Sequence, residues 1–524
     1  MQLKNKFVGL FYRIRENQKW SMFLTMIFLV VLFGITHLPR LGSDEINPDA
    51  VNWHQRSEQY IDAIKSRDFE RTYQHYHPGV TLMVIMGFPI EVAKRITQAT
   101  YDKSTYELFH TVAKYSLNFV LLLLTIYLVL NLSKIFGFVV SYSVGLLLTL
   151  DPFFLGNARI LHMDALLSMF VMNALVLMYL AYHKKSVRNL ILGSVFLGLS
   201  FWTKNVALIP IAYSICFLIG LAVVKKVAPI FSAKGILLIV LNFVLVGVFV
   251  LPALWVNPNR VITKMYGGSK TVVDEGHEQK FFGVKTDDPG FFYYPLVLAY
   301  KLSPQVLIGF LISIVWLAIL IFRDGKGVLN SKNLPLYYFL LYFVCYFTAF
   351  SISSKKIDRY MLPLFPVIYL FVSYFFIRIY RSASNPRKAI SLLTLTILTL
   401  HPLIAYFPYY FVYNSPLLGG NPSAEKTIGQ KSFGIAVFEV RDFILNNYGN
   451  VKVGLIDRKP IAQIYPNSMV FDARVIGPHN YDVLVLDSDD DAPKKTQGKF
   501  VYSKSIKIAG VNYWNFYVKS TQSE

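Results

Sequence analysis

The chain has 524 residues, of which 54% are hydrophobic and only 16% charged. A soluble globular protein carries roughly a quarter charged residues, so this composition excludes an ordinary soluble enzyme and favours repeated membrane spans. The two cysteines, Cys216 and Cys345, both lie in apolar segments, which excludes a disulfide framework and a cysteine metal motif.

The first apolar segment runs from Trp20 to Leu38 and follows a basic stretch that contains Lys4, Lys6, Arg13, Arg15 and Lys19. A bilayer core about 30 Å thick requires roughly 20 apolar residues in helical form, which this segment provides. It ends in the residues HLPR, without the small-residue cleavage site of a signal peptide. We therefore expect an uncleaved first span.

Similar apolar segments recur along most of the chain and predict a polytopic α-helical membrane protein with about eleven transmembrane helices. They lie at about 20–38, 116–133, 138–155, 165–182, 190–203, 206–224, 235–255, 304–322, 334–350, 361–377 and 389–410. The fifth segment is short. An odd number of spans places the two termini on opposite sides of the membrane.

The distribution of charge predicts the orientation. The segments assigned to the cytoplasm are rich in Lys and Arg, and their acids are Glu16 and Asp324. Basic residues concentrate on the inner side of membrane proteins, so this bias accounts for most of the net charge of +21 without nucleic acid as a partner. We expect a multi-pass plasma-membrane protein with a cytoplasmic N-terminus, and with its C-terminus and active site outside the cytoplasm.

The first outer loop, 39–115, is unusually polar. Asn47-Pro48 is a helix-start signal, and Asp49, Trp53 and Arg56 follow at a spacing that puts them on one helical face. These side chains could supply a base, a stacking surface for a sugar and a fork for a phosphate. The alternative is an amphipathic interfacial helix with a solvated charged face. Asp44 precedes this helix and is expected to lie, solvated, in the connecting turn.

Two shorter outer turns contain ionisable residues at the mouths of spans. Arg159, His162 and Asp164 lie before the fourth span, where charged groups are costly unless they are paired or hydrated. A structural Arg159–Asp164 pair is the alternative to a functional role. Lys204 lies between two apolar spans, and a lysine that snorkels to the surface is the simpler explanation.

The outer turn at 351–360 contains Lys355, Lys356 and Arg359, whose positive charges run against the inside rule. An anionic ligand at the membrane surface would explain them, and so would lipid headgroups. His75 and His77 could be imagined as metal ligands, but no tight ligand spacing supports a metal. A divalent metal is possible but unsupported.

The outer segments 256–303 and 411–524 are long, and the second changes character. Phe433 to Asn447 is typical of an amphipathic helix, and Val451–Ile456 and Tyr481–Leu486 are typical of buried strands. We expect a transmembrane catalytic module at 1–410 and a small extracytoplasmic α/β domain at 411–524. The acidic segment from Asp487 to Asp491 is predicted to be a solvated loop.

Several of these segments resemble one known class. The first outer loop with its Asp, Trp, Arg and HPG turn is similar to that of the GT-C membrane glycosyltransferases, as are LDPFFLGNARILHMDALL, GLSFWTK and KKIDRYMLPLFP. The nearest group resembles the protein O-mannosyltransferases, glycosyltransferase family 39, and their bacterial and archaeal relatives. The resemblance covers most of residues 35–420. Aminoarabinose transferases acting on lipid A share this architecture.

The resemblance implies which acid is the base. The essential acid of the family lies in an Asp-Glu pair, with Trp four positions and Arg seven positions after the Asp. Asp44-Glu45 has the dipeptide but lacks the later residues, whereas Asp49 has Trp53 and Arg56 in register but is followed by Ala50. We assign Asp49, because a site needs the shared helical face.

The resemblance also implies the substrates. The donor would be a polyprenyl-phosphate sugar, the acceptor a hydroxyl of a protein, lipid or glycan, and the course a direct displacement with inversion. Arg56, Lys355, Lys356 and Arg359 would hold the phosphate. The residues expected to shape the substrate site are Trp53, His77, Arg159, Asp164 and Lys204. A transporter or flippase of lipid-linked sugars is the rival, and a membrane anchor for the C-terminal domain is a third reading.

Overall fold

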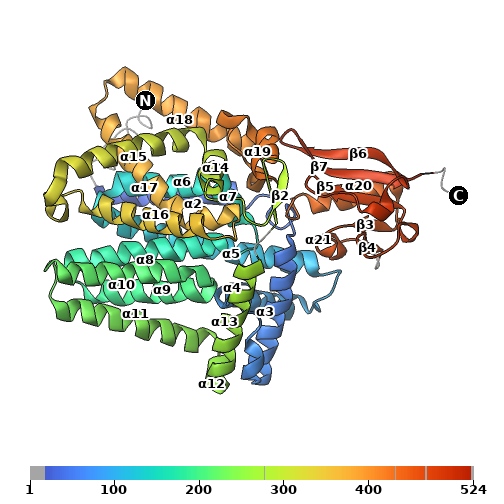
Figure 1. Cartoon of the computed structure of the whole chain (residues 1–524), viewed down its shortest axis with the longest axis horizontal. Coiled ribbons are helices and arrows are strands. Elements are labelled where there is room, and N and C mark those ends of the chain that lie inside the picture. The colour runs from blue at the N-terminus through green and yellow to red at the C-terminus, as the bar shows by residue number, and fades with distance from the viewer. Residues whose placement is uncertain (1–17, 276–277, 431, 467–468, 521–524) are drawn as a thin grey trace, which may run out of the picture.

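Most of the chain folds into helices that pack side by side, and a smaller domain built on a β-sheet lies at one end of this bundle (Figure 1). The computed structural model describes residues 18–275, 278–430, 432–466 and 469–520. The basic residues Lys4, Lys6, Arg13 and Arg15, used above for orientation, lie outside the described residues.

Nine helices in the described part of the chain are long and apolar enough to cross a membrane. They comprise α2 (Gln18–His37), α5 (Tyr106–Phe136), α8 (Asp164–Lys184), α10 (Leu208–Val223, with the short η2 Asn205–Ala207 before it), α11 (Pro229–Val250), α15 (Pro304–Asp324, continued by η3 Gly325–Asn330), α16 (Leu334–Ile352), α17 (Phe365–Ser382, preceded by η4 Asp358–Leu364) and α18 (Asn385–Ala405). The predicted polytopic helical class is confirmed.

Two of the eleven predicted spans differ from full-length helices. The third is a pair, α6 (Phe138–Leu150) and α7 (Pro152–Arg159), bent by 62°. The break falls at Asp151, whose backbone is extended because the residue before a proline avoids helical dihedral angles. The fifth is the shorter helix α9 (Val187–Thr203), which packs against α8 and α11. The described residues therefore contain nine long spans, or ten with the bent pair counted as one, besides the shorter α9.

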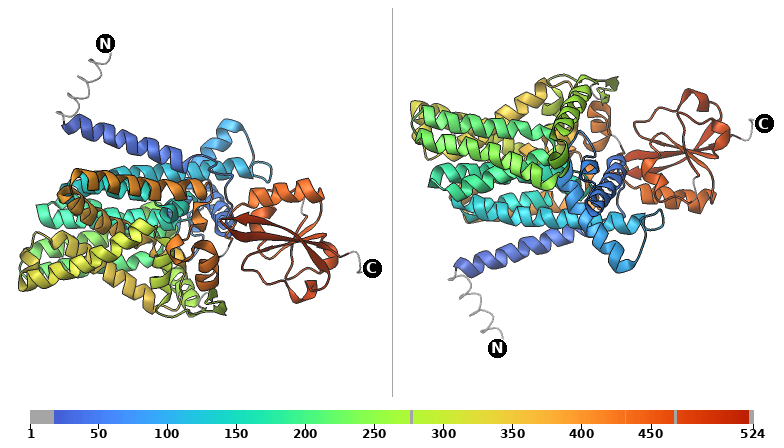
Figure 2. Two further views of the ribbon diagram at one scale, coloured as in Figure 1. Left: turned by 90° about the horizontal axis from the view of Figure 1, so that it is seen from above. Right: turned by 90° about the horizontal axis from the view of Figure 1, so that it is seen from below.

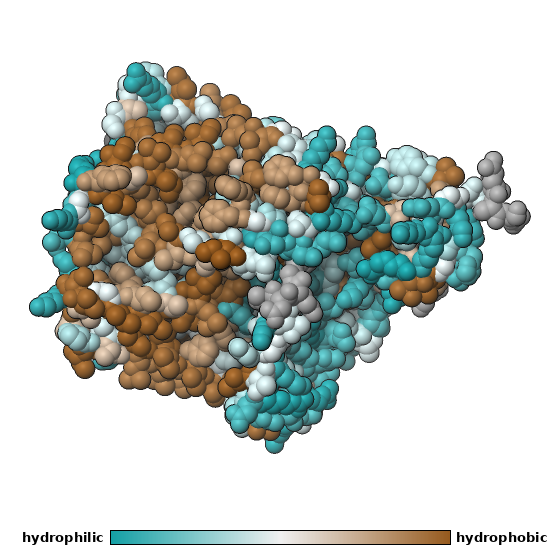
Figure 3. All heavy atoms as spheres, viewed as in Figure 1, coloured by the Kyte–Doolittle hydropathy of each residue, from teal (hydrophilic) through white to brown (hydrophobic). Residues whose placement is uncertain are grey.

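The surface of the bundle matches a lipid environment. In Figure 3 hydrophobic residues cover the bundle, whereas hydrophilic residues cover its outer end and the sheet domain. Phe249, Phe322 and Ile404 are among the large apolar side chains that point away from the protein, whereas α8 is buried in the centre. An apolar surface of this extent marks contact with a membrane.

Several outer segments fold against the end of the bundle. Helices α3 (Pro48–Ser66) and α13 (Pro258–Glu275) lie across the direction of the spans (Figure 1). The first outer loop also contains α4 (Val80–Thr97), and the following span begins at Tyr106, earlier than predicted. The large outer loop contributes α12 (Ala253–Val256), the hairpin β1 (Gln279–Phe281) and β2 (Val284–Thr286), and α14 (Tyr293–Lys301).

The C-terminal domain is a mixed five-stranded sheet with the strand order β4-β3-β5-β7-β6. Its strands are β3 (Val453–Leu455), β4 (Val470–Asp472), β5 (Val483–Asp487), β6 (Phe500–Ile508) and β7 (Val511–Lys519). Strand β3 pairs in parallel with β4 and β5, and the other pairs are antiparallel. The predicted amphipathic helix is α20 (Val437–Tyr448), and the two predicted strands are β3 and β5 with shorter limits. The sequence did not predict β4, β6 or β7.

A short antiparallel contact joins this domain to the first outer loop. Ile46 N donates to Gly434 O at 3.2 Å, and Ala436 N donates to Asp44 O at 3.1 Å. Gly434 has φ +73°, and a Cβ at this position would lie 1.9 Å from Ile46 O. Only glycine allows the two backbones to approach this closely. The domain is therefore fixed directly above the start of α3.

The two ends of the described chain lie at opposite ends of the molecule. Both views in Figure 2 show α2 starting at the end of the bundle remote from the C-terminal domain. This arrangement agrees with an odd number of crossings. The charge bias predicts that the end of the bundle where α2 begins faces the cytoplasm.

We predict that cysteine labelling will place the C-terminal domain outside the cell. In a background with Cys216 and Cys345 changed to Ala, Lys326→Cys should react with an impermeant maleimide only from the inside. Asn446→Cys, which lies on α20, should react only from the outside. Right-side-out and inverted vesicles provide the two measurements, and labelling of both positions from one face would contradict the predicted topology.

Candidate functional site

A cavity of about 470 Å³ lies between the outer end of the bundle and the C-terminal domain. The membrane part contributes α3, the turn before α4, the loop between α7 and α8, and the segment before η4. The C-terminal part contributes the loops that follow β3 and β5. Lining residues that could carry chemistry are Asp49, Trp53, Arg56, His75, His77, His162, Lys204, Lys355, Arg359, Asp457, Asp489 and Tyr513.

Asp49 is the second residue of α3 and lies at the wall of the cavity. Asn47 caps the helix, because its Oδ1 accepts a hydrogen bond from Ala50 N at 2.7 Å. The Asp49 side chain is 41% exposed, and its Oδ2 lies 3.3 Å from His162 Nε2 and 3.4 Å from Arg359 Nη2. Burial alone would raise the pKa of Asp49, but the hydrogen-bonding contact with His162 and the positive charge of Arg359 hold it well below the usual range. Asp49 is therefore a carboxylate, which accepts hydrogen bonds and protons.

A buried ion-pair cluster lies beneath Asp49. Asp164, at the start of α8, has a side chain that is only 4% exposed. Its two oxygens lie 2.5 Å from Lys204 Nζ, 3.0 Å from Arg359 Nε and 3.0 Å from His162 Nδ1. Lys204 thus does not snorkel to the surface; its ammonium faces Asp164 and the ring of Tyr360. These contacts join the mouths of three membrane segments at the base of the cavity.

The alternative of a structural Arg159–Asp164 pair is not realised, because Lys204, His162 and Arg359 occupy the surroundings of Asp164. Arg359 is also stacked over the ring of Phe433 at 4.4 Å. Its guanidinium therefore lies between two carboxylates and an aromatic face, at the point where the cavity meets the C-terminal segment.

Trp53 and Arg56 lie together on α3, as the helical spacing predicted. The Arg56 guanidinium lies 4.6 Å from the centre of the Trp53 ring. In the described part of the chain, Arg56 makes no ion pair within 4.0 Å. Trp53 packs against Gly79, which has φ +55° and where a Cβ would lie 2.1 Å from the indole. The HPG turn thus leaves room for the aromatic ring at the cavity wall.

His75 and His77 line the same cavity from the turn before α4. Burial and the nearby charge of Arg56 lower the pKa of His75 to about 4. Burial and the charge of Lys204 lower the pKa of His77 to about 3. Both imidazoles are therefore neutral near pH 7, and they can form hydrogen bonds with a polar ligand but cannot neutralise a phosphate.

The neighbours Lys355 and Lys356 have different surroundings. Lys355 lines the cavity. Lys356 is buried, and its Nζ lies 2.7 Å from Asp288 Oδ1 in the large outer loop. The expectation that Lys356 holds a phosphate is therefore corrected, because its ammonium is paired with a carboxylate away from the cavity.

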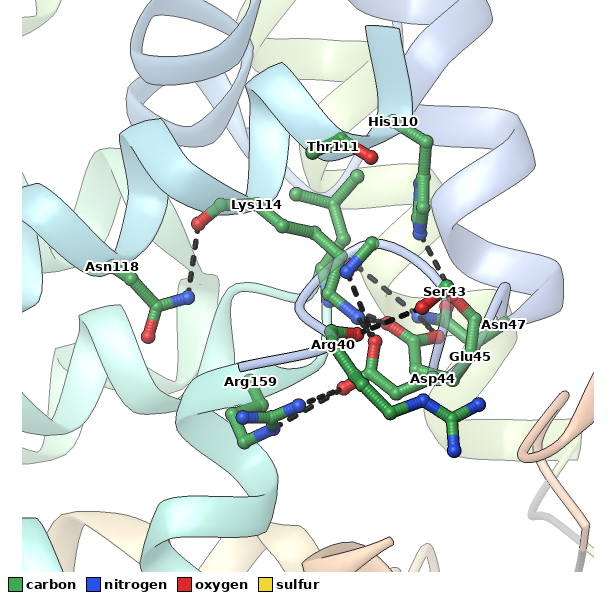
Figure 4. A network of polar contacts seen from close by, with 12 residues as sticks. Arg40, Ser43, Asp44, Glu45, Asn47, His110, Thr111, Lys114, Asn118 and Arg159 are labelled. Carbon is green, nitrogen blue, oxygen red and sulfur yellow. Dashed lines mark hydrogen bonds and ion pairs between the residues drawn. The ribbon is translucent and has the colours of Figure 1, made fainter. Parts of the chain in front are cut away.

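Asp44 does not lie in a solvated turn, contrary to the expectation from the sequence. Figure 4 shows it in a buried network with Glu45, Lys114 and Arg159. Lys114 Nζ donates to Asp44 Oδ1 at 2.5 Å and to Glu45 Oε1 at 2.9 Å, and Arg159 Nη2 donates to Asp44 Oδ2 at 2.9 Å. Burial would raise the pKa of Asp44, but the charges of Lys114 and Arg159 lower it.

Arg159 belongs to this network and does not line the cavity, so its expected role in shaping the substrate is corrected. Its guanidinium donates to the carbonyl oxygens of Thr36, His37 and Pro39 at the end of α2. Last-turn carbonyls lack partners within their own helix, and a buried cation satisfies them here. Arg159 is thus a structural residue that joins α2, the first outer loop and α7.

The acidic run at 487–491 is only partly solvated. Asp489 lines the cavity, accepts a hydrogen bond from Gln430 N at 3.0 Å and lies 3.7 Å from Lys280 Nζ. Asp457 reaches the cavity from the loop after β3. Sequence reasoning missed both, although acids that directly follow predicted strands are a usable signal, because the carboxyl ends of parallel strands share one edge.

No metal site can be assigned from geometry within the described ranges. None of their His, Cys, Asp and Glu side chains forms a group of three or more arranged to hold a metal ion.

No protein-family model matches the chain, and no curated protein matches it. Among solved structures, the oligosaccharyltransferase of Archaeoglobus fulgidus in the apo form is similar at a TM-score of 0.50 and 11% identity, over 97% of this chain and 75% of that one. ArnT from Cupriavidus metallidurans bound to undecaprenyl phosphate has a TM-score of 0.49 and 11% identity, over 97% and 99% of the two chains. No match singles out glycosyltransferase family 39. The chain has a GT-C type fold, that of polytopic membrane glycosyltransferases.

Proposed function

We propose that this protein is a glycosyltransferase that moves a sugar from a polyprenyl-phosphate donor to a hydroxyl acceptor outside the cytoplasm. The observation that carries the proposal is the composition of the cavity. One half-exposed carboxylate, Asp49, faces an outer membrane-level cavity together with the cations Arg56, Lys355 and Arg359. This is the set of groups that a sugar phosphate and an attacking hydroxyl require.

The proposed reaction is a direct displacement at the anomeric carbon. Asp49 accepts the proton of the acceptor hydroxyl as its oxygen attacks that carbon, and the bond to the phosphate oxygen breaks. Arg56, Lys355 and Arg359 stabilise the charge that develops on the departing phosphate. With Asp49 acting as a base and not as a nucleophile, the displacement proceeds with inversion of configuration.

The charges around Asp49 support a dependence of the base on the donor. Without a bound phosphate, the contact with His162 and the positive charge of Arg359 lower the pKa of Asp49 and weaken it as a base. A bound phosphate brings negative charge to the same cations. Its field raises the pKa of Asp49, so the carboxylate becomes a stronger base when the donor is in place.

The neutral groups of the cavity support a sugar as the transferred unit. Trp53 offers an apolar edge with the neutral imidazole of His75 at 6.4 Å between ring centres, and the neutral His77 lines the same cavity. On the opposite wall, Asp457, Asp489 and Tyr513 of the C-terminal domain provide acceptors and a phenol. We assign this wall to the acceptor, which is a hydroxyl of a protein side chain, a lipid or a glycan. A hexose such as mannose is the expected sugar.

The alternative, a transporter or flippase, needs polar groups along a path through the bundle. The buried charged side chains in the described segments do not follow such a path. They belong to outer segments or to the outer ends of spans: Asp44, Glu45, Lys114, Asp151, Arg159, Asp164, Lys204, Lys301 and Lys356. A site at the outer surface fits transfer better than passage.

The test is transfer in proteoliposomes with two kinds of labelled donor. Polyprenyl-phosphate sugars should give glycosylated products in mass spectrometry, whereas nucleotide sugars without polyprenyl phosphate should give none. Candidate peptides, lipids and glycans with free hydroxyls are offered together as acceptors. Transfer from a nucleotide sugar alone would refute the proposed donor. Absence of transfer from every lipid-linked donor would refute the proposed glycosyltransferase function.

A further inference from the structure

His162 lies between two carboxylates, one at the cavity and one buried beneath it. Its Nε2 is 3.3 Å from Asp49 Oδ2, and its Nδ1 is 3.0 Å from Asp164 Oδ2. The imidazole is nearly buried, and the ring of Phe433 covers it with 6.3 Å between the ring centres. The charged groups that face this cluster from other segments are Arg359 and Lys204, which both contact Asp164.

The carboxylate of Glu45 helps to position both His162 and Asp49. Glu45 Oε1 accepts a hydrogen bond from Leu161 N at 3.1 Å, directly before His162. Glu45 Oε2 accepts from Asn47 Nδ2 at 3.0 Å, and Asn47 is the cap of the helix that carries Asp49. The two facing side chains are therefore positioned by the same buried group and are not neighbours by chance.

Hydrogen-bond chemistry limits what such an imidazole can do. Both neighbours are carboxylates, which accept hydrogen bonds and donate none when ionised. A neutral imidazole has one N–H and one acceptor nitrogen, so it can serve only one carboxylate. Consistent with this, His162 Nδ1 and Asp164 Oδ2 are buried and close together but form no aligned hydrogen bond with any described residue. An imidazole that carries a second proton serves both.

We propose that His162 takes the acceptor proton from Asp49 and holds it between the two carboxylates until the products leave. The proposal rests on the proposed transfer reaction. The O–H bond of the acceptor breaks, its electron pair forms the glycosidic bond, and the electron pair of the sugar–phosphate bond leaves with the phosphate. The proton passes from Asp49 Oδ2 to His162 Nε2, and later to the phosphate monoester or to water. His162 is thus a positioning residue that acts through Asp49.

The test compares His162→Gln and His162→Asn with the unchanged protein in the proteoliposome assay. Turnover should fall by about 10- to 100-fold, below the full effect of a general base because Asp49 remains. The KM for the donor should stay within about twofold, because the phosphate ligands are unchanged. The pH dependence of kcat should also differ between the unchanged protein and both variants, because the group that accepts the proton from Asp49 is removed.

Two further measurements separate this role from a structural one. Added imidazole should restore part of the turnover of His162→Gly, because it can occupy the space and accept the proton. The control is His479→Asn, an exposed histidine of the C-terminal domain, which should leave turnover and the pH profile unchanged.

Three results would overturn the inference in distinguishable ways. Normal turnover in the His162 variants, with the unchanged protein active, would refute the role of His162 and leave the proposed function intact. Reduced turnover with an unaltered pH profile and no rescue by imidazole would show a merely structural residue. Absence of transfer by the unchanged protein would refute the proposed function and, with it, this inference.

Discussion

Asn in place of Asp49 is expected to stop transfer while donor binding remains. The change keeps the size of the side chain and removes the proton acceptor, and general-base help is typically worth about 10²–10⁴ in rate. The proposed phosphate ligands Arg56, Lys355 and Arg359 are untouched, so we expect the loss to fall on kcat and the KM for the donor to change little. Initial rates at several donor concentrations in proteoliposomes measure both quantities.

Arg56→Gln provides the matched contrast, because Arg56 lies on the same helical face but has the opposite role. It should raise the KM for the donor, which Asp49→Asn should not, and it should lower kcat less than Asp49→Asn does, since the base stays in place. Thermal unfolding of both variants should resemble that of the unchanged protein, because both side chains border the cavity. A fully active Asp49→Asn variant would show that the base lies elsewhere.

The membrane architecture could be predicted from the sequence because its signal is local. Runs of apolar residues long enough to cross a bilayer mark the spans, and Asn47-Pro48 marks the start of α3. Helical periodicity alone placed Asp49, Trp53 and Arg56 on one face, and all three line the cavity. What these predictions share is that each depends on residues within a few turns of one helix.

The errors concern partners that are distant in the sequence. Asp44 was expected to be solvated because it precedes Pro48 in a connecting turn, whereas its partners are Lys114 and Arg159. The alternative of an Arg159–Asp164 pair is not realised, since Lys204 and Arg359, from other segments, contact Asp164. Lys356 was grouped with Lys355 by proximity, but consecutive residues in an irregular turn point in different directions.

The C-terminal domain shows a third kind of limit. Short strands such as β3 and β5 were predicted from apolar runs, but their neighbours in the sheet are fixed by pairing over long separations. Asp457 and Asp489 could therefore not be predicted to line the same cavity as Asp49. Only the packing of the domain on the first outer loop, through Gly434 and Ile46, brings these groups together.

The largest loss of stability is expected from changes in the buried network around Asp44. It contains two carboxylates and two cations, and the Lys114 side chain has no exposed surface. Asp44→Asn leaves Lys114 and Arg159 facing Glu45 alone. Removal of one partner of a buried ion pair costs about 3–5 kcal/mol, because a charge remains without compensation in a region of low polarity.

Asp44→Asn should therefore lower the unfolding temperature in detergent and reduce the yield of folded protein, whereas Asp49→Asn should affect neither. Lys114→Met should be similarly damaging, because it leaves Asp44 and Glu45 with Arg159 as their sole cation among the four residues. Thermal unfolding and size-exclusion chromatography of the three purified variants measure the difference. The comparison separates a catalytic aspartate from a structural one five residues earlier.

The double variant Asp44→Asn with Lys114→Met decides whether charge balance is the cause. It leaves one carboxylate, Glu45, and one cation, Arg159, so the charges in the network again cancel. Residues in one ion-pair network are coupled, and the double variant should lose less stability than the sum of the two single losses. Simple additivity would show that the single losses come from packing. A stable but inactive Asp44→Asn protein would instead indicate that Asp44 and Glu45 are the catalytic pair and that Asp49 is not the base.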